Sequence, residues 1–246
     1  MTAVRTDPRV VFRTSEQLRL NARRLEHLAA CSLVPAGEHV LDVGAGVGDL
    51  DDFFLDRDCR VTVTDARAQN IAAAKTDLVI ATEGTGAMSR VRFGVLDLDA
   101  PPRLPLSESF GAVVCFGVIH LLARPAEALA WCAAQAKGML LIDAVVTTDR
   151  AESLKLVPAS AGSPDGAAGR FESRMSRAWL YTRLKQLMPH VYSTAMRPLH
   201  EAYLPDWSQS GVGAARKGRA MFIASRGALS NPALIEDLPD RYPDGP

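Results

Sequence analysis

Three aspartates and one glycine-rich run stand out in the first half of the chain. The run Gly-x-Gly-x-Gly occupies residues 44–48 and follows a short apolar segment that contains Asp42. Because glycine has no Cβ, such a turn between a strand and a helix lets a ligand approach the backbone at the helix N-terminus. Asp65 ends the next apolar segment, where a carboxylate can accept hydrogen bonds from ribose hydroxyl groups, and Asp97 ends the segment after that. The pattern predicts a nucleoside site at the ends of neighbouring strands.

This arrangement resembles the class I methyltransferase family, whose Rossmann-like domain binds S-adenosylmethionine. The resemblance covers about residues 40–144 and implies a methyltransferase with that cofactor. It implies that the glycine turn packs against the methionine part, that Asp65 takes both ribose hydroxyls, and that Asp97 and Leu98 contact the adenine. The end of the fourth strand would flank the methionine and face the acceptor. The expected cofactor-binding residues are Asp42, Gly44, Ala45, Gly46, Gly48, Asp65, Ala66, Asp97, Leu98, Cys115 and Phe116.

A dinucleotide-dependent oxidoreductase is the main rival within the same architecture. Tyr181 and Lys185 have the Tyr-x-x-x-Lys spacing of short-chain dehydrogenases, in which the lysine lowers the tyrosine pKa. However, Ala167, Ala168 and Gly169 stand where the partner serine is expected. Asp49 also replaces the last glycine of a Gly-x-Gly-x-x-Gly fingerprint, and an acid there repels a pyrophosphate. The sequence therefore favours S-adenosylmethionine over NAD(P).

A methyl acceptor that must lose a proton needs a base, and His120 is the candidate catalytic residue. It follows the predicted fourth strand on the side expected to face the acceptor. A structural role, capping the next helix, is the alternative for His120. His190, His200 and Glu201 are further polar candidates, and a metal site of His200, Glu201 and Asp206 lacks a ligand spacing typical of such sites, so no metal is predicted.

Charge and motifs point to a small-molecule acceptor. Lysine plus arginine and aspartate plus glutamate number 28 each, so the formal net charge is zero and nucleic acid is disfavoured as a partner. The Asn/Asp-Pro-Pro-Tyr/Phe motif of enzymes that methylate exocyclic amines is absent, since Cys115-Phe116-Gly117-Val118 stands there. We expect O-, N- or C-methylation of a small molecule, in bacterial secondary metabolism. Two alternatives stay open: a tRNA or protein methyltransferase that uses Arg19, Arg23 and Arg24, and a cofactor-binding scaffold without turnover.

The apolar patterning predicts the elements that must position these residues. Strands and helices alternate, which is typical of βαβ units in a parallel sheet with helices on both faces. The last third differs, because two strands follow each other without a helix and predict an antiparallel hairpin at the sheet edge. The fold class is thus α/β, Rossmann-like, with a mostly parallel seven-stranded sheet. Strands are expected at 39–43, 60–65, 91–95, 110–115, 138–144, 191–196 and 219–225, and helices at 10–32, 49–56, around 71–75, 127–136 and 176–188.

The ends of the chain are expected to surround this domain. Residues 1–36 form a helical lid, with Ser15 as the N-cap, residues 37–226 form the methyltransferase domain, and residues 227–246 form a tail that is a surface strap or disordered. Residues 146–174 are a second part of the lid, of which 159–169 are mobile. No signal peptide or membrane span is recognised, and the four cysteines form no ligand pair, so we expect a cytoplasmic protein without a membrane partner.

Overall fold

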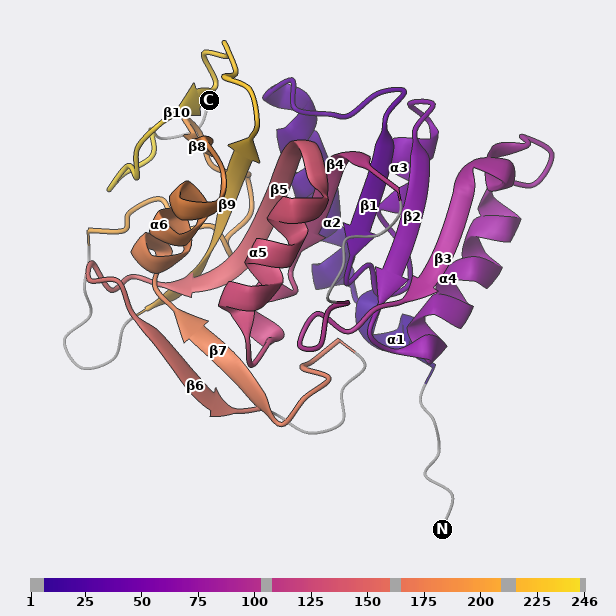
Figure 1. Ribbon diagram of the computed structural model, residues 1–246, viewed down its shortest axis with the longest axis horizontal. Helices are drawn as coiled ribbons and strands as arrows, with labels where there is room; N and C mark the ends of the chain where they lie inside the picture. Colours follow the sequence, from indigo (N-terminus) through magenta and orange to yellow (C-terminus); the bar gives the residue numbers. More distant parts are fainter. Residues whose placement is uncertain (1–6, 103–107, 160–164, 209–215, 244–246) are drawn as a thin grey trace.

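An eight-stranded sheet forms the centre of the protein (Figure 1). The computed structural model describes residues 7–102, 108–159, 165–208 and 216–243. The strands follow the order β10-β8-β9-β5-β4-β1-β2-β3, and the five from β3 to β5 are parallel. β9 pairs antiparallel with β5, and β8 pairs antiparallel with β9. This topology confirms the predicted fold class, including the antiparallel hairpin.

The elements lie close to the predicted ranges. Along the chain they are α1 (Arg9–Phe12), α2 (Ser15–Ala30), β1 (His39–Val43), α3 (Asp51–Leu55), β2 (Arg60–Asp65), α4 (Ala68–Ala81), the 3-10 helix η1 (Ala87–Arg90), β3 (Val91–Val95), β4 (Phe110–Phe116), the 3-10 helix η2 (Ile119–Leu121), α5 (Pro125–Gln135), β5 (Ala136–Thr147), β6 (Leu154–Pro158), β7 (Phe171–Met175), α6 (Arg177–Leu187), β8 (His190–Thr194), β9 (Lys217–Ser225) and β10 (Leu234–Ile235).

Apolar side chains of each central strand point alternately to the two faces of the sheet, and they form one hydrophobic core on each face. Leu41 and Val43 of β1 pack with α5 and α6, whereas Val40 packs with α2, α3 and α4. Successive side chains of a strand point to opposite faces, so a continuous apolar strand supplies both cores. Asp42 therefore points to the face that α3 covers. This is why an aspartate can be buried inside a central strand beneath the glycine turn.

The prediction of one continuous helix over residues 10–32 is wrong, because this segment forms two helices. α1 ends at Phe12, and α2 begins after Thr14, whose hydroxyl accepts the Gln17 N–H at 3.2 Å. Thr14, not Ser15, is therefore the N-cap, since its backbone is extended and its side chain caps the first turn. The break between α1 and α2 lets α1 turn onto the sheet edge near the glycine run.

The sheet has one strand more than predicted, because the tail contributes β10. β10 pairs antiparallel with β8, and residues 227–243 run over the surface as a strap. Asn231 Nδ2 donates to the carbonyl of Cys31 at 2.7 Å, and Trp207 N–H donates to the carbonyl of Asp240 at 2.8 Å. These bonds tie the end of the chain to α2 and to the segment between β8 and β9.

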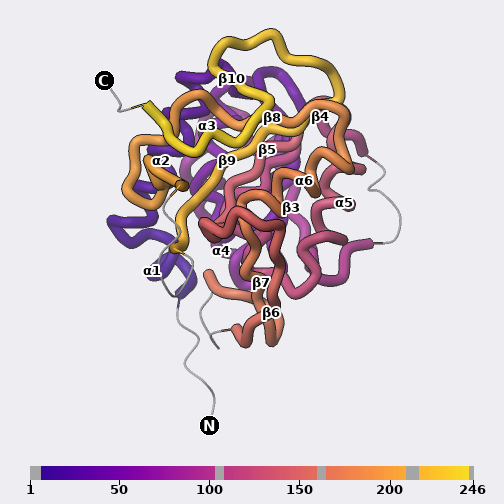
Figure 2. Tube along the Cα trace, turned by 90° about the vertical axis from the view of Figure 1, so that its left-hand side faces the viewer, coloured from indigo at the N-terminus to yellow at the C-terminus, as the bar shows by residue number. Residues whose placement is uncertain are grey.

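A hairpin that the sequence analysis missed lies at the carboxyl edge of the parallel strands. β6 and β7 form a separate two-stranded antiparallel sheet within the segment predicted as a lid. Figures 1 and 2 show this hairpin projecting below the main sheet, on the side of the molecule where α1 lies. Part of the segment predicted to be mobile, residues 160–164, lies outside the described residues. The strands predicted from the sequence do not include 154–158 and 171–175, which form β6 and β7.

Candidate cofactor and acceptor site

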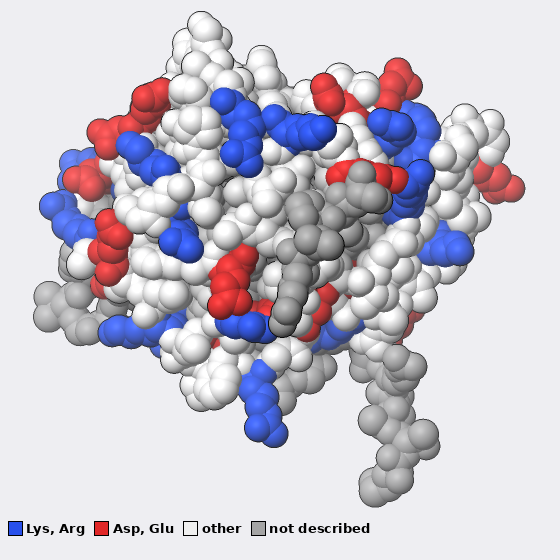
Figure 3. Space-filling model, viewed as in Figure 1, with Lys and Arg blue, Asp and Glu red and all other residues white. Residues whose placement is uncertain are grey.

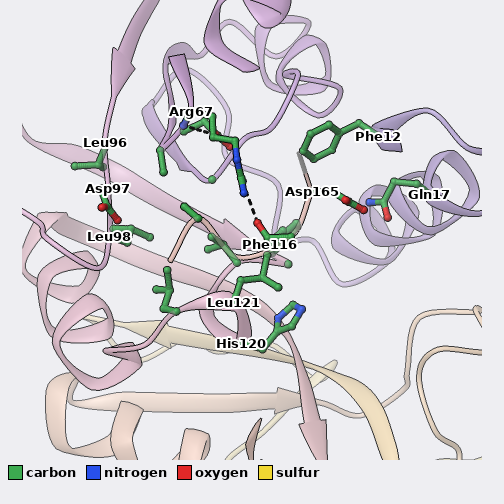
Figure 4. Close-up of a pocket in the computed structure, with 18 of the residues that line it drawn as sticks. Phe12, Gln17, Arg67, Leu96, Asp97, Leu98, Phe116, His120, Leu121 and Asp165 are labelled. Atoms are coloured by element: carbon green, nitrogen blue, oxygen red, sulfur yellow. Dashed lines mark hydrogen bonds between the residues drawn. The ribbon is translucent and has the colours of Figure 1, made fainter. Parts of the chain in front are cut away.

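A cavity of about 240 Å³ opens at the carboxyl ends of β1, β2, β3 and β4. α1, α2 and the segment between β6 and β7 border it on the outside, and β9 contributes one arginine (Figure 4). Because the strands are parallel, their carboxyl ends meet at one edge, where α/β sheets bind their ligands. Its lining residues are Phe12, Gln17, Arg24, Gly44, Asp65, Ala66, Arg67, Leu96, Asp97, Leu98, Phe116, Gly117, Val118, His120, Leu121, Leu122, Asp165, Gly166, Ala168 and Arg219.

Most of the predicted site residues meet in this cavity, and five do not line it. The lining includes Gly44, Asp65, Ala66, Asp97, Leu98, Phe116 and His120. Asp42 and Cys115 are buried side chains that point to the two opposite cores of the sheet. Ala45, Gly46 and Gly48 shape the turn behind the lining. The predicted site residues thus fall into two groups. One group lines the cavity, and the other lies behind the lining, in the glycine turn or in the core of the sheet.

Asp65, at the end of β2, is held by three N–H groups. Its Oδ2 accepts from the Gly46 backbone at 3.1 Å, and its Oδ1 accepts from the Arg67 backbone at 2.8 Å and from Asn70 Nδ2 at 3.0 Å. Burial raises the pKa of Asp65, while the N–H groups of Arg67 and Gly46 oppose that shift. A carboxylate has about four acceptor positions, so about one is left for a ligand hydroxyl. Asp65 therefore both fixes the glycine turn and faces the cavity.

The glycines of the turn are required by their backbone angles and by close neighbours. Gly44 has φ +71°, and a Cβ there would lie 2.7 Å from a methyl carbon of Val118. Gly46 has φ +60°, and a Cβ there would lie 2.4 Å from the ring of Phe12. Left-handed angles disfavour other residues, and the contacts leave no room for a side chain. The turn is packed between η2 on one side and α1 on the other.

The third aspartate, Asp97, lies at the edge of the cavity beside Leu98. Asp97 is exposed at the rim, and one of its carboxylate oxygens accepts the Asp99 N–H at 2.9 Å. Leu98 beside it is almost completely buried and lines the cavity. An acceptor next to an apolar side chain suits the amino group and the ring face of an adenine.

The other end of the cavity is lined by two arginines that share one carboxylate. Arg24 of α2 donates from Nη2 to Asp143 Oδ1 at 2.7 Å, and Arg219 of β9 donates to the same oxygen. The Tyr203 hydroxyl donates to Asp143 Oδ2. Burial alone would raise the pKa of Asp143, but the charges of Arg24 and Arg219 outweigh it and lower that pKa to about 2. Asp143 is therefore ionised, and this end of the cavity contains two cations and one anion.

His120 lies on η2, next to this cluster. Its Nδ1 accepts the Val145 backbone N–H at 3.4 Å, so the neutral ring carries its proton on Nε2. Burial, reinforced by the charge of Arg219, lowers the pKa of His120 to about 3. A histidine with so low a pKa is a weak base, and in this tautomer Nε2 is a hydrogen-bond donor.

Arg67 fastens the segment between β6 and β7 across the cavity. Its Nη1 and Nη2 donate to the carbonyls of Gly166 and Ala167, each at 2.9 Å (Figure 4). Gly166 and Ala168 line the cavity, and Asp165 lies beside Gln17 in the close-up. This segment and α1 limit access to the cavity from solvent.

The residues that suggested an oxidoreductase lie elsewhere. Tyr181 of α6 is buried in the core against Phe222, and its hydroxyl donates to the carbonyl of Val191 at 3.5 Å. The ammonium of Lys185 lies 5.2 Å from the centre of the tyrosine ring. Neither residue lines the cavity, and Asp49 forms an ion pair with Arg13 at 2.7 Å. The Tyr-x-x-x-Lys spacing is a feature of core packing here.

The polar cluster around His200 differs from the trio considered from the sequence. His200 and Glu201 lie near Glu16 of α2, whereas Asp206 pairs with Arg241 at 3.1 Å. Nδ1 of His200 accepts the Ala202 N–H at 3.2 Å, so its Nε2 carries the proton and faces Glu16 at 3.6 Å. Arg19 bridges Glu16 and Glu201. The geometry is that of an ion-pair cluster.

The three arginines proposed as an RNA-binding face do not form one. Arg19 pairs with two glutamates, Arg23 pairs with Glu26 at 2.5 Å, and Arg24 is buried against Asp143. On the face drawn in Figure 3, basic and acidic side chains are interspersed. Among the residues that the structure describes, no helix combines the length and the apolar composition needed to cross a bilayer.

Sequence reasoning missed several lining residues because they come from distant segments. Phe12 belongs to the predicted lid, but no pattern indicates its contact with Gly46. Arg24 was considered only as part of an exposed RNA-binding face. It lies four residues from both Leu20 and Leu28, and this spacing places it on the buried side of α2. For Arg219, on a strand at the far side of β5, we find no local signal.

Comparisons with known proteins agree with this geometry. Residues 41–137 match the family described as methyltransferase domain. The N-terminal domain of EvdMO1, solved in the presence of SAH and D-fucose, is similar with a TM-score of 0.62 at 16% identity, over 87% of this chain and 84% of that chain. Magnesium protoporphyrin IX methyltransferase from Synechocystis PCC 6803 with bound SAH is similar with a TM-score of 0.53 at 16% identity, over 92% and 89% of the two chains. The glycopeptide N-methyltransferase MtfA is similar with a TM-score of 0.54 at 18% identity, over 87% of this chain and 99% of that chain.

A search among curated proteins found no match. At these identities the solved structures establish the fold, and the family match covers the segment that contains the glycine turn, Asp65, Asp97 and His120. Residues 41–137 therefore match a methyltransferase domain, and the chain has the Rossmann-like fold found in S-adenosylmethionine-dependent methyltransferases, as its sequence predicted.

Proposed function

We propose that this methyltransferase uses S-adenosylmethionine to methylate a small organic acceptor on oxygen, nitrogen or carbon. The observation that carries the proposal is a single cavity that joins the glycine turn, Asp65 and Asp97 at one end to His120 and two arginines at the other. The first end offers contacts for a nucleoside, and the second has polar groups that the nucleoside does not need.

The residues present fit the cofactor. Gly44 lines the cavity, and its missing Cβ lets the turn pack against Val118, so we propose that the backbone of the turn contacts the methionine part. Asp65 has about one free acceptor position, so we propose one direct hydrogen bond from a ribose hydroxyl instead of two. Ala66, Asp97 and Leu98 would surround the adenine, and Phe116 would lie beside the sulfur.

With S-adenosylmethionine bound, the available chemistry is the transfer of a sulfonium methyl group. The protein then has to align the acceptor and exclude water. Alignment of reactants contributes about 7–11 kcal/mol in favourable cases. α1 and residues 165–168, fastened by Arg67, would exclude water. We propose that His120 donates a hydrogen bond from Nε2 to the acceptor and does not remove a proton from it.

Several observations support a small acceptor. The zero net charge and the paired arginines of α2 do not favour RNA. Proteins with a similar structure include a magnesium protoporphyrin IX methyltransferase, a glycopeptide N-methyltransferase and a 1,6-didemethyltoxoflavin-N1-methyltransferase from Burkholderia thailandensis. By analogy we place this chain in bacterial secondary metabolism. Its four buried free cysteines suit the reducing cytoplasm.

Calorimetry with S-adenosylhomocysteine and with NADH tests the cofactor assignment. We expect micromolar binding of S-adenosylhomocysteine and no binding of NADH. Asp65→Ala should weaken the first by about 1.5–3 kcal/mol, because the ribose and the turn each lose a partner. Asp56→Ala, an exposed aspartate outside the cavity, is the matched control. Equal affinity of Asp65→Ala and the parent would show that the ribose assignment is wrong.

Turnover with labelled S-adenosylmethionine and pools of small molecules then separates an enzyme from a cofactor-binding scaffold. Transfer of label to a pool component supports the enzyme. Cofactor binding without transfer to any small molecule, tRNA or protein pool supports the scaffold. Label in tRNA, with a steep salt dependence of binding, supports the RNA alternative.

A further inference from the structure

At the acceptor end of the cavity, two guanidinium groups share one carboxylate. Arg24 and Arg219 share the single carboxylate of Asp143, and both guanidinium groups line the cavity. The Tyr203 hydroxyl that also contacts Asp143 is neutral, because burial and the neighbouring carboxylate raise its pKa. His120 is neutral as well. Two cations therefore face one anion, in a site where the side chain of Arg24 is only 2% exposed.

Two other acidic groups of the cavity lie at its cofactor end. Asp65 and Asp97 lie on the side of β2 and β3, and the three N–H donors of Asp65 already use most of its acceptor positions. Asp165 lies beside Gln17 in the close-up (Figure 4). A buried charge is costly unless it is paired, so an arrangement with one spare cation favours an anionic ligand.

The arginines also have unused donors. In the described part of the chain, Nε of Arg24 has no hydrogen-bond acceptor. The guanidinium of Arg219 donates only through Nη1 there, to Asp143, and its side chain is 14% exposed. Both groups lie around Gly117, where an added Cβ would be 3.3 Å from Arg24 Nη2 and 3.8 Å from Arg219 Nη1. Gly117 has φ +79°, and its N–H donates to the carbonyl of Asp143 at 2.8 Å.

We infer that Arg24 and Arg219 bind a carboxylate group of the methyl acceptor, which is therefore a small organic acid. Guanidinium groups suit this ligand, because their planar donors match the two oxygens of a carboxylate. This inference rests on the proposed function and adds the chemical class of the substrate to it. Arg219 is the specificity-determining residue, and Asp143 positions both arginines.

The cofactor itself contains a carboxylate, so the experiment must separate the two sources. The cofactor end is built on β1, β2 and β3, whereas Arg219 is on β9, beyond β4 and β5 in the sheet. This position favours the acceptor. If the arginines held the cofactor carboxylate instead, loss of Arg219 would weaken binding of S-adenosylhomocysteine directly.

The probe is sodium benzoate, with benzamide as its neutral counterpart of nearly the same shape. Both are titrated by ligand-observed NMR onto protein saturated with S-adenosylhomocysteine, at about 0.15 M ionic strength to limit surface effects. We expect benzoate to bind at least about tenfold more tightly than benzamide. Arg219→Gln should remove this preference, and Arg219→Lys should restore part of it. Arg92→Gln removes an exposed arginine outside the cavity and should leave the preference for benzoate unchanged.

The outcomes are distinct. Equal binding of benzoate and benzamide, or no binding of either, would overturn the inference. A loss of more than about tenfold in affinity for S-adenosylhomocysteine in Arg219→Gln would also overturn it, and would assign the arginines to the cofactor. If the parent protein does not bind S-adenosylhomocysteine at all, the proposed function fails instead. Arg219 is chosen over the more buried Arg24 because its replacement leaves Asp143 paired with Arg24 and Tyr203.

Discussion

Arg24 and Asp143, 119 residues apart in the chain, form a buried ion pair with an Nη2–Oδ1 distance of 2.7 Å. The pair joins α2 to the central strand β5, and it places a guanidinium group at the wall of the cavity. Because Arg219 donates to the same oxygen, one carboxylate orders side chains from three elements. α2 is thus part of the site as well as of the core.

Replacement of this carboxylate should destabilise the protein strongly. Asp143→Asn leaves two buried arginines without a counter-charge, and breaking such a pair costs about 3–5 kcal/mol. The free energy of unfolding, measured by urea denaturation, should fall by that amount. Asp240→Asn is the matched control, because Asp240 pairs with Arg150 at an exposed site and should change stability by less than about 1 kcal/mol. Equal effects of the two variants would contradict the assignment.

The same ion pair predicts a loss of stability in acid. The pKa of Asp143 is lowered to about 2 in the folded protein, below its usual value of 3.8. A depressed folded-state pKa contributes stability above the unfolded pKa, and this is lost as pH falls from about 4 to about 2. The melting temperature of the parent should fall more steeply over that range than that of Asp143→Asn. Parallel pH profiles of the two proteins would show that Asp143 is not ionised.

A second carboxyl pair predicts the opposite pH dependence. Asp42 and Asp51 are both buried beneath the glycine turn. Burial, with the charge of Asp65, raises the pKa of Asp42 to about 7, although the hydrogen bond with Asp51 opposes the shift. Burial and the charge of Asp42 raise the pKa of Asp51 well above its usual value. A raised folded-state pKa contributes stability that is lost as pH rises through it, by about 2–4 kcal/mol between about pH 4 and pH 8. Asp51→Asn removes one ionisable group and lets an amide donate to Asp42. Its melting temperature should exceed that of the parent at about pH 8 and approach it at about pH 5.

Asp58→Asn is the matched control for Asp51→Asn, because it makes the same aspartate-to-asparagine change close to the end of α3. Asp58 is 94% exposed and has φ +59°, which asparagine tolerates, so its melting profile should match that of the parent. If Asp51→Asn were no more stable than the parent at about pH 8, the two acids would not share a proton in the folded protein.

The contact between Phe12 of α1 and Gly46 of the glycine turn can be measured by a double-mutant cycle. Gly46→Ala places a methyl group into the ring of Phe12 and adds left-handed strain, about 1–2 kcal/mol for the backbone and about 1–3 kcal/mol for the overlap. Gly84→Ala has a similar φ of +75° with open space around it, so it should show the backbone cost alone. In a Phe12→Ala background, the cost of Gly46→Ala should fall to that of Gly84→Ala. Additive effects of the two substitutions would show that Phe12 does not cover the turn.

The ionisation of His120 can be measured without an acceptor. Burial and the charge of Arg219 lower the pKa of His120 to about 3, so its imidazole should stay neutral across the physiological range. Ring signals that disappear from the NMR spectrum in His120→Gln should keep constant chemical shifts between about pH 5 and pH 8 in the parent. A titration midpoint within that range would restore His120 as a general base.

Local patterns were sufficient for most of the fold. Val61 and Val63 alternate with polar residues in β2, and such alternation predicts strands without any knowledge of their partners. The β6 and β7 strands escaped notice because each is only five residues long and the apolar side chains of β6 are largely exposed, so they form no core pattern. β10, only two residues long, is defined by its pairing with β8 and has no pattern of its own.

Sequence alone determined that Gly44, Asp65, Asp97 and His120 would share one edge, because parallel strands all end on the same side of a sheet. Which side chains complete that edge depends on how the helices and the antiparallel strands pack on the sheet. Phe12 contacts Gly46, and Arg24 and Arg219 pair with one carboxylate of β5, across segments far apart in the chain. The helical spacing of Arg24 places it on the buried side of α2, but a periodic pattern carries no information on the partner of a single side chain. These contacts therefore could not be predicted from the sequence.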